Sequence, residues 1–142
     1  MDLRSFYQSI ILENSKATKH RHDVDPHSFQ AEGYNPSCGD DIILSALVED
    51  GILKDIGFKG QGCAISQASA NIMIDLIKGK SKEEALQTID LFMSLIKDDN
   101  LSEDEKEKLE AAIALEGVKD MPTRVKCATL AWHTIKLELE KI

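Results

Sequence analysis

The apolar positions near the start of the chain follow a helical spacing. Between Asp2 and about Lys16 they recur three, four, seven and eight residues after the first, at Leu3, Phe6, Tyr7, Ile10 and Ile11. Side chains at this spacing share one face of an α-helix. The pattern therefore predicts a helix over residues 2–16 whose apolar stripe packs on the core.

The pattern changes to that of strands after residue 27. Residues 28–34 (SFQAEGY), 42–49 (IILSALVE) and 52–59 (ILKDIGFK) are short apolar runs bounded by turn residues. The Asp50-Gly51 pair between the last two runs is typical of a tight hairpin. We therefore expect a three-stranded antiparallel meander, in which the loop NPSCGDD (residues 35–41) joins the first two strands.

Helical signals return after the third strand. Gly60 and Gly62 interrupt that strand, and a new apolar stripe begins at Ile65 and continues until Gly79. These breaks predict a helix whose first turn lies at Cys63. Many residues of this segment are small, so we expect the helix to lie close to the sheet.

Two capping-box sequences predict the next helices. SKEE (residues 81–84) opens one to about Ile96, and SEDE (residues 102–105) opens another to about Leu115. The charge run over residues 98–110 is interpreted as a solvated face, with a docking surface as the alternative. A final helix begins at residues 121–123 and extends to the C-terminus.

Composition bounds the class of protein. The order of helix, three strands and helices predicts an α+β fold, with residues 1–142 as a single domain. The chain has 42% hydrophobic and 30% charged residues, no long apolar stretch and no leader sequence, which predicts a cytoplasmic protein with no membrane partner. Its formal charge of -8 disfavours nucleic acid and favours a partner with a basic patch.

The three cysteines are the candidate chemistry. Cys38 lies in the strand-joining loop, Cys63 at a helix start, and Cys127 in or near the first turn of the last helix. An odd number at wide spacing does not indicate a disulfide framework, although each cysteine alone also fits a small buried apolar side chain. If these element ends converge, three thiolates and the Asp40 carboxylate supply four ligands for zinc or for iron in a cluster.

Other polar residues carry weaker signals. Arg124 and Lys126 flank Cys127. Cations at a helix start are unfavourable unless an anionic site lies nearby, so they are candidates for electrostatic support of the thiolates. His20, His22 and His27 share one loop, where solvated side chains are more common than a metal site. We expect His133 to lie at the surface or half-buried, and Trp132 and Phe58 to lie in the core.

Three motifs together resemble a known family. YNPSCGD, FKGQGCAISQASANIM and TRVKCATLAW are similar to the three cysteine motifs of the IscU/NifU-like iron-sulfur assembly proteins, in the same order and over nearly the whole chain. Two features resemble the SufU-type branch: Lys126 stands where the IscU branch has histidine, and an extra segment of about residues 98–118 precedes the last motif. The chaperone-recruiting sequence of the IscU branch is replaced by MPTRVK.

The resemblance implies a set of roles. It implies a zinc site made by Cys38, Asp40, Cys63 and Cys127, and a sulfurtransferase role in which Cys38 accepts persulfide sulfur from a cysteine desulfurase of the SufS type. The pyridoxal phosphate belongs to the desulfurase, and the sulfur passes to downstream iron-sulfur assembly proteins.

Two rival hypotheses remain open. The same ligands suit a scaffold that holds a transient [2Fe-2S] or [4Fe-4S] cluster. They also suit a structural zinc domain, although such sites usually draw on close CxxC pairs, which are absent from the sequence. Lysine at 126 removes one candidate cluster ligand and favours the sulfur acceptor.

Overall fold

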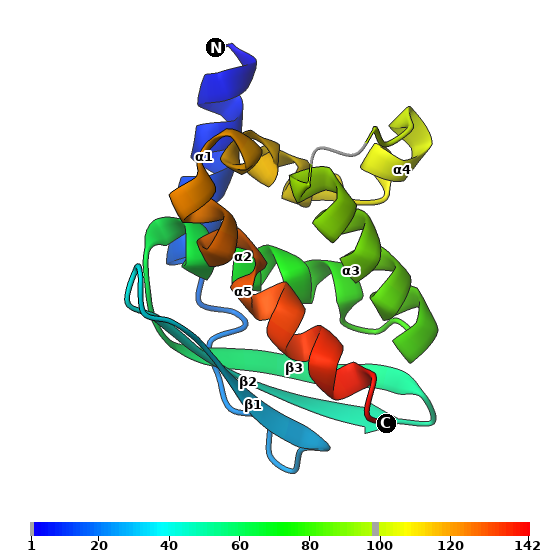
Figure 1. Cartoon of the computed structure of the whole chain (residues 1–142). Helices are drawn as coiled ribbons and strands as arrows, with labels where there is room; N and C mark the ends of the chain where they lie inside the picture. Colours follow the sequence, from blue (N-terminus) through cyan, green and yellow to red (C-terminus); the bar gives the residue numbers. More distant parts are fainter. Residues whose placement is uncertain (1, 98–99) are drawn as a thin grey trace.

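One three-stranded sheet carries the helices on a single face (Figure 1). The computed structural model describes residues 2–97 and 100–142, so Asp98 and Asp99 of the charge run lie outside the described residues. The elements are α1 (Leu3–Lys16), β1 (Phe29–Asn35), β2 (Asp40–Glu49), β3 (Ile52–Gln61), α2 (Ala64–Ile77), α3 (Lys82–Ile96), α4 (Glu103–Glu107), the 3₁₀-helix η1 (Glu110–Asp120) and α5 (Pro122–Leu139).

The sheet is the predicted antiparallel meander, in the order β1-β2-β3. Its register opposes Asn35 to Asp40 at the β1–β2 turn and Glu49 to Ile52 at the β2–β3 turn. Asp50 (φ 54°) and Gly51 (φ 75°) both adopt the left-handed conformation that a tight hairpin turn requires. The α+β class and the predicted sheet are confirmed.

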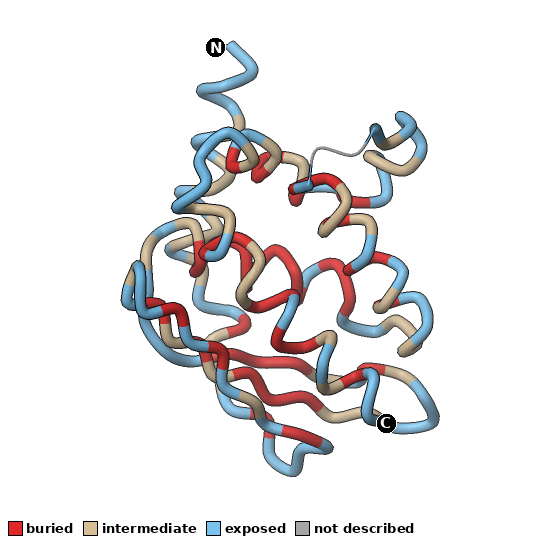
Figure 2. Tube along the Cα trace, in the orientation of Figure 1, coloured by how far each residue is buried: buried red, intermediate tan, exposed pale blue. Residues whose placement is uncertain are grey.

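The core lies between the sheet and the helices. Alternate residues of β2 point inward, so that Ile42, Leu44 and Ala46 are fully buried. Figure 2 shows buried segments along β2, β3 and α2. Phe58 and Trp132 lie in the core as expected, and Trp132 stacks on Phe92 with ring centroids 3.9 Å apart.

The second capping box opens a shorter helix than expected. Both hydrogen bonds of the Ser102–Glu105 box are present, but α4 ends at Glu107. Glu110 has a positive φ of 47°, which a continuous α-helix cannot accommodate, and the chain goes on as η1. The prediction of one helix to about Leu115 is therefore wrong, whereas α4, which buries no residue, fits the expected solvated face.

The first helix is less buried than its apolar stripe predicts. Ile10 and Ile11 are partly buried against the core, but Leu3 and Phe6 are 64% and 50% exposed. Figure 1 shows the reason, because the N-terminal end of α1 extends beyond the other helices. The predicted core packing holds only for the second half of α1. No helix in the described ranges is long and apolar enough to cross a membrane.

Candidate functional site

Three donor side chains meet where the β1–β2 loop approaches α5. One sulfur or oxygen atom from each of Cys38, Asp40 and Cys127 lies within 4.8 Å of the others. The two sulfur atoms are 3.0 Å apart. In residues 2–97 and 100–142 this is the one group of three or more histidine, cysteine or acidic side chains close enough to hold a metal ion.

Asp40 is the buried centre of this group. Its Oδ1 accepts hydrogen bonds from the Cys63 amide (2.9 Å) and the Ser66 hydroxyl (3.0 Å), and its Oδ2 accepts one from the Asn35 amide (3.2 Å). Burial raises the pKa of Asp40, but these bonds and one from Cys127 outweigh it and hold that pKa below its ordinary value. The Asp40 carboxylate is therefore ionised and held in place, as a metal ligand requires.

Cys63 brings the fourth candidate ligand to the same place. It is the N-cap of α2 and is half-buried, and its amide fixes Asp40. Its sulfur lies outside the 4.8 Å group, but its side chain is close enough to raise the pKa of Cys127. A Cβ at Gly62 would collide with Asp40 and Ser66, so glycine is needed for this close approach.

Cys127 is the deepest of the three thiols, at 1% exposure. Because α5 begins at Pro122, Cys127 lies in its second turn, near the helix start as expected. Burial raises the pKa of the Cys127 thiol well above its usual range, and its neighbours Cys38, Asp40 and Cys63 raise it further. A cation is the complement that would hold these groups in the anionic form.

Cys38 is the thiol on the most open segment. It is half-buried, whereas the flanking Pro36, Ser37 and Gly39 are exposed. Gly39 has a φ of 70° and no atom near the position of a Cβ, so the loop turns here without packing against the rest of the protein. Cys38 can therefore be reached from outside while its sulfur lies beside Cys127.

The two cations predicted to support the thiolates lie on different sides of α5. Arg124 is one turn before Cys127, and hydrogen bonding to Cys127 together with the charges of the three cysteines raises the pKa of its guanidinium. Lys126 is exposed and lines a separate hollow with His133, which is also exposed. Residues two apart in a helix point in nearly opposite directions, which explains the separation.

A buried serine joins the two cysteine-bearing helices behind the site. Ser69 of α2 donates to the Ala128 carbonyl of α5 (2.5 Å) and accepts from Trp132 Nε1 (2.7 Å). Neither Ser69 nor Asn35 was singled out from the sequence. Asn35 precedes Cys38 in the loop motif, a signal that could have indicated it, whereas the bond of Ser69 depends on the packing of two distant helices.

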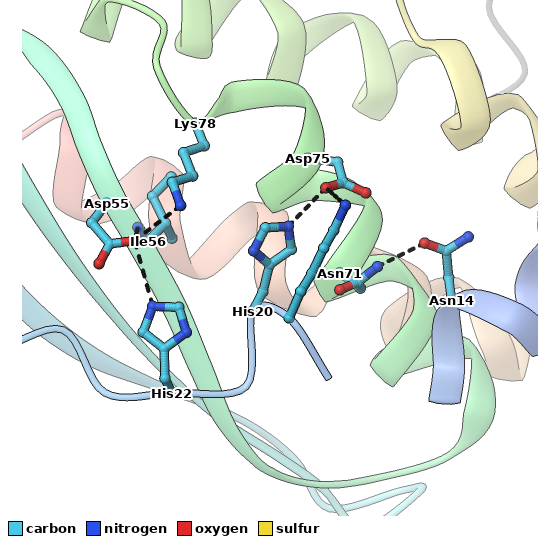
Figure 3. A network of polar contacts seen from close by, with 9 residues as sticks. Asn14, His20, His22, Asp55, Ile56, Asn71, Asp75 and Lys78 are labelled. Atoms are coloured by element: carbon cyan, nitrogen blue, oxygen red, sulfur yellow. Dashed lines mark hydrogen bonds and ion pairs between the residues drawn. The ribbon is translucent and has the colours of Figure 1, made fainter. Parts of the chain in front are cut away.

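The histidines of the 19–27 loop do not gather. Figure 3 shows His20 and His22 pointing to different carboxylates, with His20 Nε2 2.7 Å from Asp75 Oδ1 and His22 Nε2 3.4 Å from Asp55 Oδ1. His27 Nδ1 is 3.1 Å from the Val24 carbonyl. The expectation of solvated loop histidines is wrong for His20, which is only 6% exposed because Asp75 of α2 holds it inward.

The donor set fits a thiophilic metal. Thiolates with one carboxylate are ligands that zinc accepts in tetrahedral sites, and the same thiolates suit the iron atoms of a cluster. The hydrogen bonds to Asp40 supply the outer support that such ligands usually have. The fold and the site thus define an α+β protein with a candidate three-cysteine, one-aspartate metal centre.

Comparison with known proteins gives the family. Residues 6–141 match the model of the NifU-like N-terminal domain, and the chain belongs to this family. It is 39% identical over its full length to the iron-sulfur cluster assembly scaffold protein IscU of Thermotoga maritima, covering 98% of that protein. It is 34% identical to the zinc-dependent sulfurtransferase SufU of Bacillus subtilis, over 99% of this chain and 93% of that one.

Solved structures agree with this assignment. A protein from Fervidobacterium islandicum, described as an iron-sulfur cluster assembly scaffold protein for the SUF system, superposes with a TM-score of 0.88 at 36% identity, covering 97% of this chain and 99% of that one. The N-terminal part of a NifU-like protein from Brucella abortus shares the fold, with a TM-score of 0.83 at 19% identity over 95% and 94% of the two chains. The resemblance to the IscU/NifU-like family and its SufU-type branch is confirmed.

Proposed function

We propose that this chain is an iron-sulfur cluster assembly protein that accepts persulfide sulfur on Cys38 at a zinc site. The observation that carries the proposal is the convergence of Cys38, Asp40 and Cys127, with Cys63 beside them. The similarity to the sulfurtransferase of Bacillus subtilis, whose name states its zinc dependence, supports the choice of metal.

The proposed zinc ligands are Cys38, Asp40, Cys63 and Cys127. A zinc ion bound there would keep its thiol ligands deprotonated at neutral pH. Asp40 is already fixed by three donors, so it needs no rearrangement to bind a cation. Arg124 faces the same thiols and offsets the excess negative charge that three thiolates and a carboxylate would create.

The proposed reaction moves one sulfur atom between two cysteines. The donor is the persulfide of a pyridoxal-phosphate cysteine desulfurase of the SufS type. The Cys38 thiolate attacks the outer sulfur, a new S–S bond forms at Cys38, and the old S–S bond breaks so that the donor cysteine leaves as a thiolate. Electrons balance without an external oxidant. Cys38 suits this role because its loop is exposed, whereas Cys127 is buried.

The experiment that tests the role of Cys38 is persulfide mapping. The zinc-loaded chain is incubated with the desulfurase and L-cysteine, alkylated, and digested for mass spectrometry. We expect one added sulfur on the peptide of Cys38 in the native chain and in the control His22→Ala, whose side chain lies in the histidine loop. Cys38→Ala should gain none, and equal labelling of Cys38→Ala would contradict the proposal.

A scaffold for a cluster is the second candidate function. It is favoured by the name of the Thermotoga maritima relative. Against it, the residue before Cys127 is a lysine that lines a separate hollow, so it adds no donor to the thiols. Reconstitution with iron and sulfide under anaerobic conditions separates the two, because a scaffold should bind iron and acid-labile sulfide stoichiometrically and a dedicated sulfur acceptor should not.

A further inference from the structure

A small hollow adjoins the loop that carries Cys38. It has a volume of about 210 Å³ and lies between the end of β1 and the outer side of α5. Tyr34 and Pro36 form one wall, and Lys126, Thr129 and His133 form the other. Pro36 precedes Cys38 by two residues, so whatever occupies the hollow also lies against the Cys38 loop.

The α5 wall is a single helical face. Lys126, Thr129 and His133 are separated by three and four residues, a spacing that aligns side chains on one side of a helix. A Cβ at Gly33 would collide with Thr134, so α5 lies directly against β1 next to the hollow. The spacing between the two walls is therefore set by the contact of the β1 backbone with the Thr134 and Leu130 side chains of α5.

The lining of the hollow offers hydrogen-bond donors and no negative charge. Lys126 brings an ammonium group, and Tyr34, Thr129 and His133 bring hydroxyl and imidazole groups. No acidic residue lines it, although the chain has 25 of them. The larger hollow between α1 and η1 contrasts with it, because Glu116 and Asp120 line that one.

Lys126, the cation of the hollow, is available to bind an anion. Within residues 2–97 and 100–142, no ion pair involves Lys126, and its side chain is exposed. Arg124, by comparison, is engaged by the three cysteines. A carboxylate that enters the hollow would meet Lys126 without displacing an internal partner.

We propose that this hollow receives an acidic side chain of the sulfur-donor protein and sets the donor's position over Cys38. The inference rests on the proposed function, since a sulfur donor has to cover the loop beside the hollow in order to reach Cys38. The chain's formal charge of -8 favours a mainly basic partner surface, and one acidic residue on such a surface would be attracted to this cationic hollow. The hollow thus determines how the donor protein is oriented, whereas the overall charge of the chain attracts it.

The test is a binding measurement that does not depend on sulfur transfer. The dissociation constant for the cysteine desulfurase of the same organism is measured by isothermal titration calorimetry with the native chain, Lys126→Glu and the control Lys54→Glu. Lys54 is exposed on β3, and its substitution makes the same change in net charge. We expect Lys126→Glu to weaken binding by about tenfold or more, because a like charge would face the carboxylate, and Lys54→Glu by less than about twofold.

A kinetic measurement gives the second readout. In the persulfide assay, Lys126→Glu should raise the half-saturating concentration of this chain and leave the rate at saturation unchanged, because Lys126 positions the donor and does not touch the reacting sulfur. Equal binding by Lys126→Glu and Lys54→Glu, or no binding by the native chain, overturns the docking site. If Lys126→Glu weakens binding but the native chain gains no sulfur on Cys38, the docking site stands and the proposed function is overturned.

Discussion

Two polar clusters of this protein are built on opposite principles. In residues 19–27, here called the strap, basic side chains meet carboxylates: Lys19 contacts Asp75 at 2.8 Å, and His20 contacts the same carboxylate at 2.7 Å (Figure 3). In the thiol site, Cys38 and Cys127 instead meet each other and the Asp40 carboxylate, all of which are neutral or negative. When its thiols are ionised, the second cluster carries more negative charge than Arg124 beside it offsets.

The difference separates a cluster made for stability from one made for a ligand. The strap is attached to β3 and α2 by its backbone as well, since the His20 carbonyl accepts from the Phe58 amide at 2.9 Å and Arg21 lies 4.8 Å above the Phe58 ring. Most of its polar side chains have partners within the chain, although the buried His20 Nδ1 has none. The thiol site, by contrast, holds thiols and a carboxylate whose anionic forms a bound metal cation would stabilise.

The largest expected effect is that of removing the metal. A chelator should lower the free energy of unfolding by about 4 kcal/mol if zinc was present at about a thousand times its dissociation constant. For a chain of this length that is a fall of about 10 °C in Tm, measured by calorimetry. Asp40→Ala should show almost no chelator-dependent shift, and Asp75→Ala should keep it. If a chelator lowered the Tm of Asp40→Ala as much as that of the native chain, the thiol site would not be the metal site and the distinction between the two clusters would fail.

The next effect concerns the close contact between Gly57 of β3 and the strap. A Cβ at Gly57 would collide with the backbone carbonyl of His22, so Gly57→Ala should lower the free energy of unfolding by about 3 kcal/mol. Gly117→Ala is the control, because nothing lies near its Cβ position and its φ is not positive. Urea unfolding measures both. Zinc content should be unchanged in both, and a loss of zinc in Gly57→Ala would show that the clusters are coupled.

A smaller effect is expected at the serine behind the thiols. Ser69→Ala leaves the buried Trp132 Nε1 without an acceptor and should cost about 2 kcal/mol of stability. Trp132 is the only tryptophan in the sequence, so its fluorescence reports the unfolding directly. Thr88→Ala is the control, since that hydroxyl bonds only to a carbonyl of its own helix. Similar losses in the two variants would argue against a specific tie between α2 and α5.

The smallest effect is the pH dependence of the strap. Burial raises the pKa of Asp75, but hydrogen bonds from Lys19 and His20 outweigh it, so the pKa is lowered from its ordinary value of 3.8. Its contribution is therefore present above pH 4 and lost as the pH falls through the lower pKa of the folded state. Compared with Asp75→Asn, the native chain should be more stable by under about 1 kcal/mol at pH 7, since the Asp75 side chain is 40% exposed. A difference that grows on acidification would contradict this sign.

The sequence was informative where local physics decides the outcome. Alternating apolar residues, the Asp50-Gly51 turn and the two capping boxes predicted the meander and the starts of α3 and α4, because each signal acts within a few residues. Helical geometry also predicts the separation of Arg124 from Lys126, because residues two apart point in nearly opposite directions, so the expectation that Lys126 supports the thiols is wrong.

Distant packing decides the features that local patterns do not encode. The candidate site was expected from the resemblance, because the approach of Cys38 to Cys127 depends on how α5 lies against the sheet end, which spacing along the chain does not give. The same holds for His20, whose partner Asp75 lies on α2, and for Leu3 and Phe6, which stay exposed because α1 extends past the core. The break at Glu110 has no obvious residue signal, since a positive φ is unusual for glutamate.

The most direct test of the account is the metal content of the native chain. Protein purified under anaerobic conditions without added metal is analysed for zinc, iron and acid-labile sulfide, together with Asp40→Ala and Cys63→Ser. The account predicts one zinc per native chain, and a loss of zinc in both variants. Iron with sulfide in place of zinc, or no metal in the native chain, would contradict it.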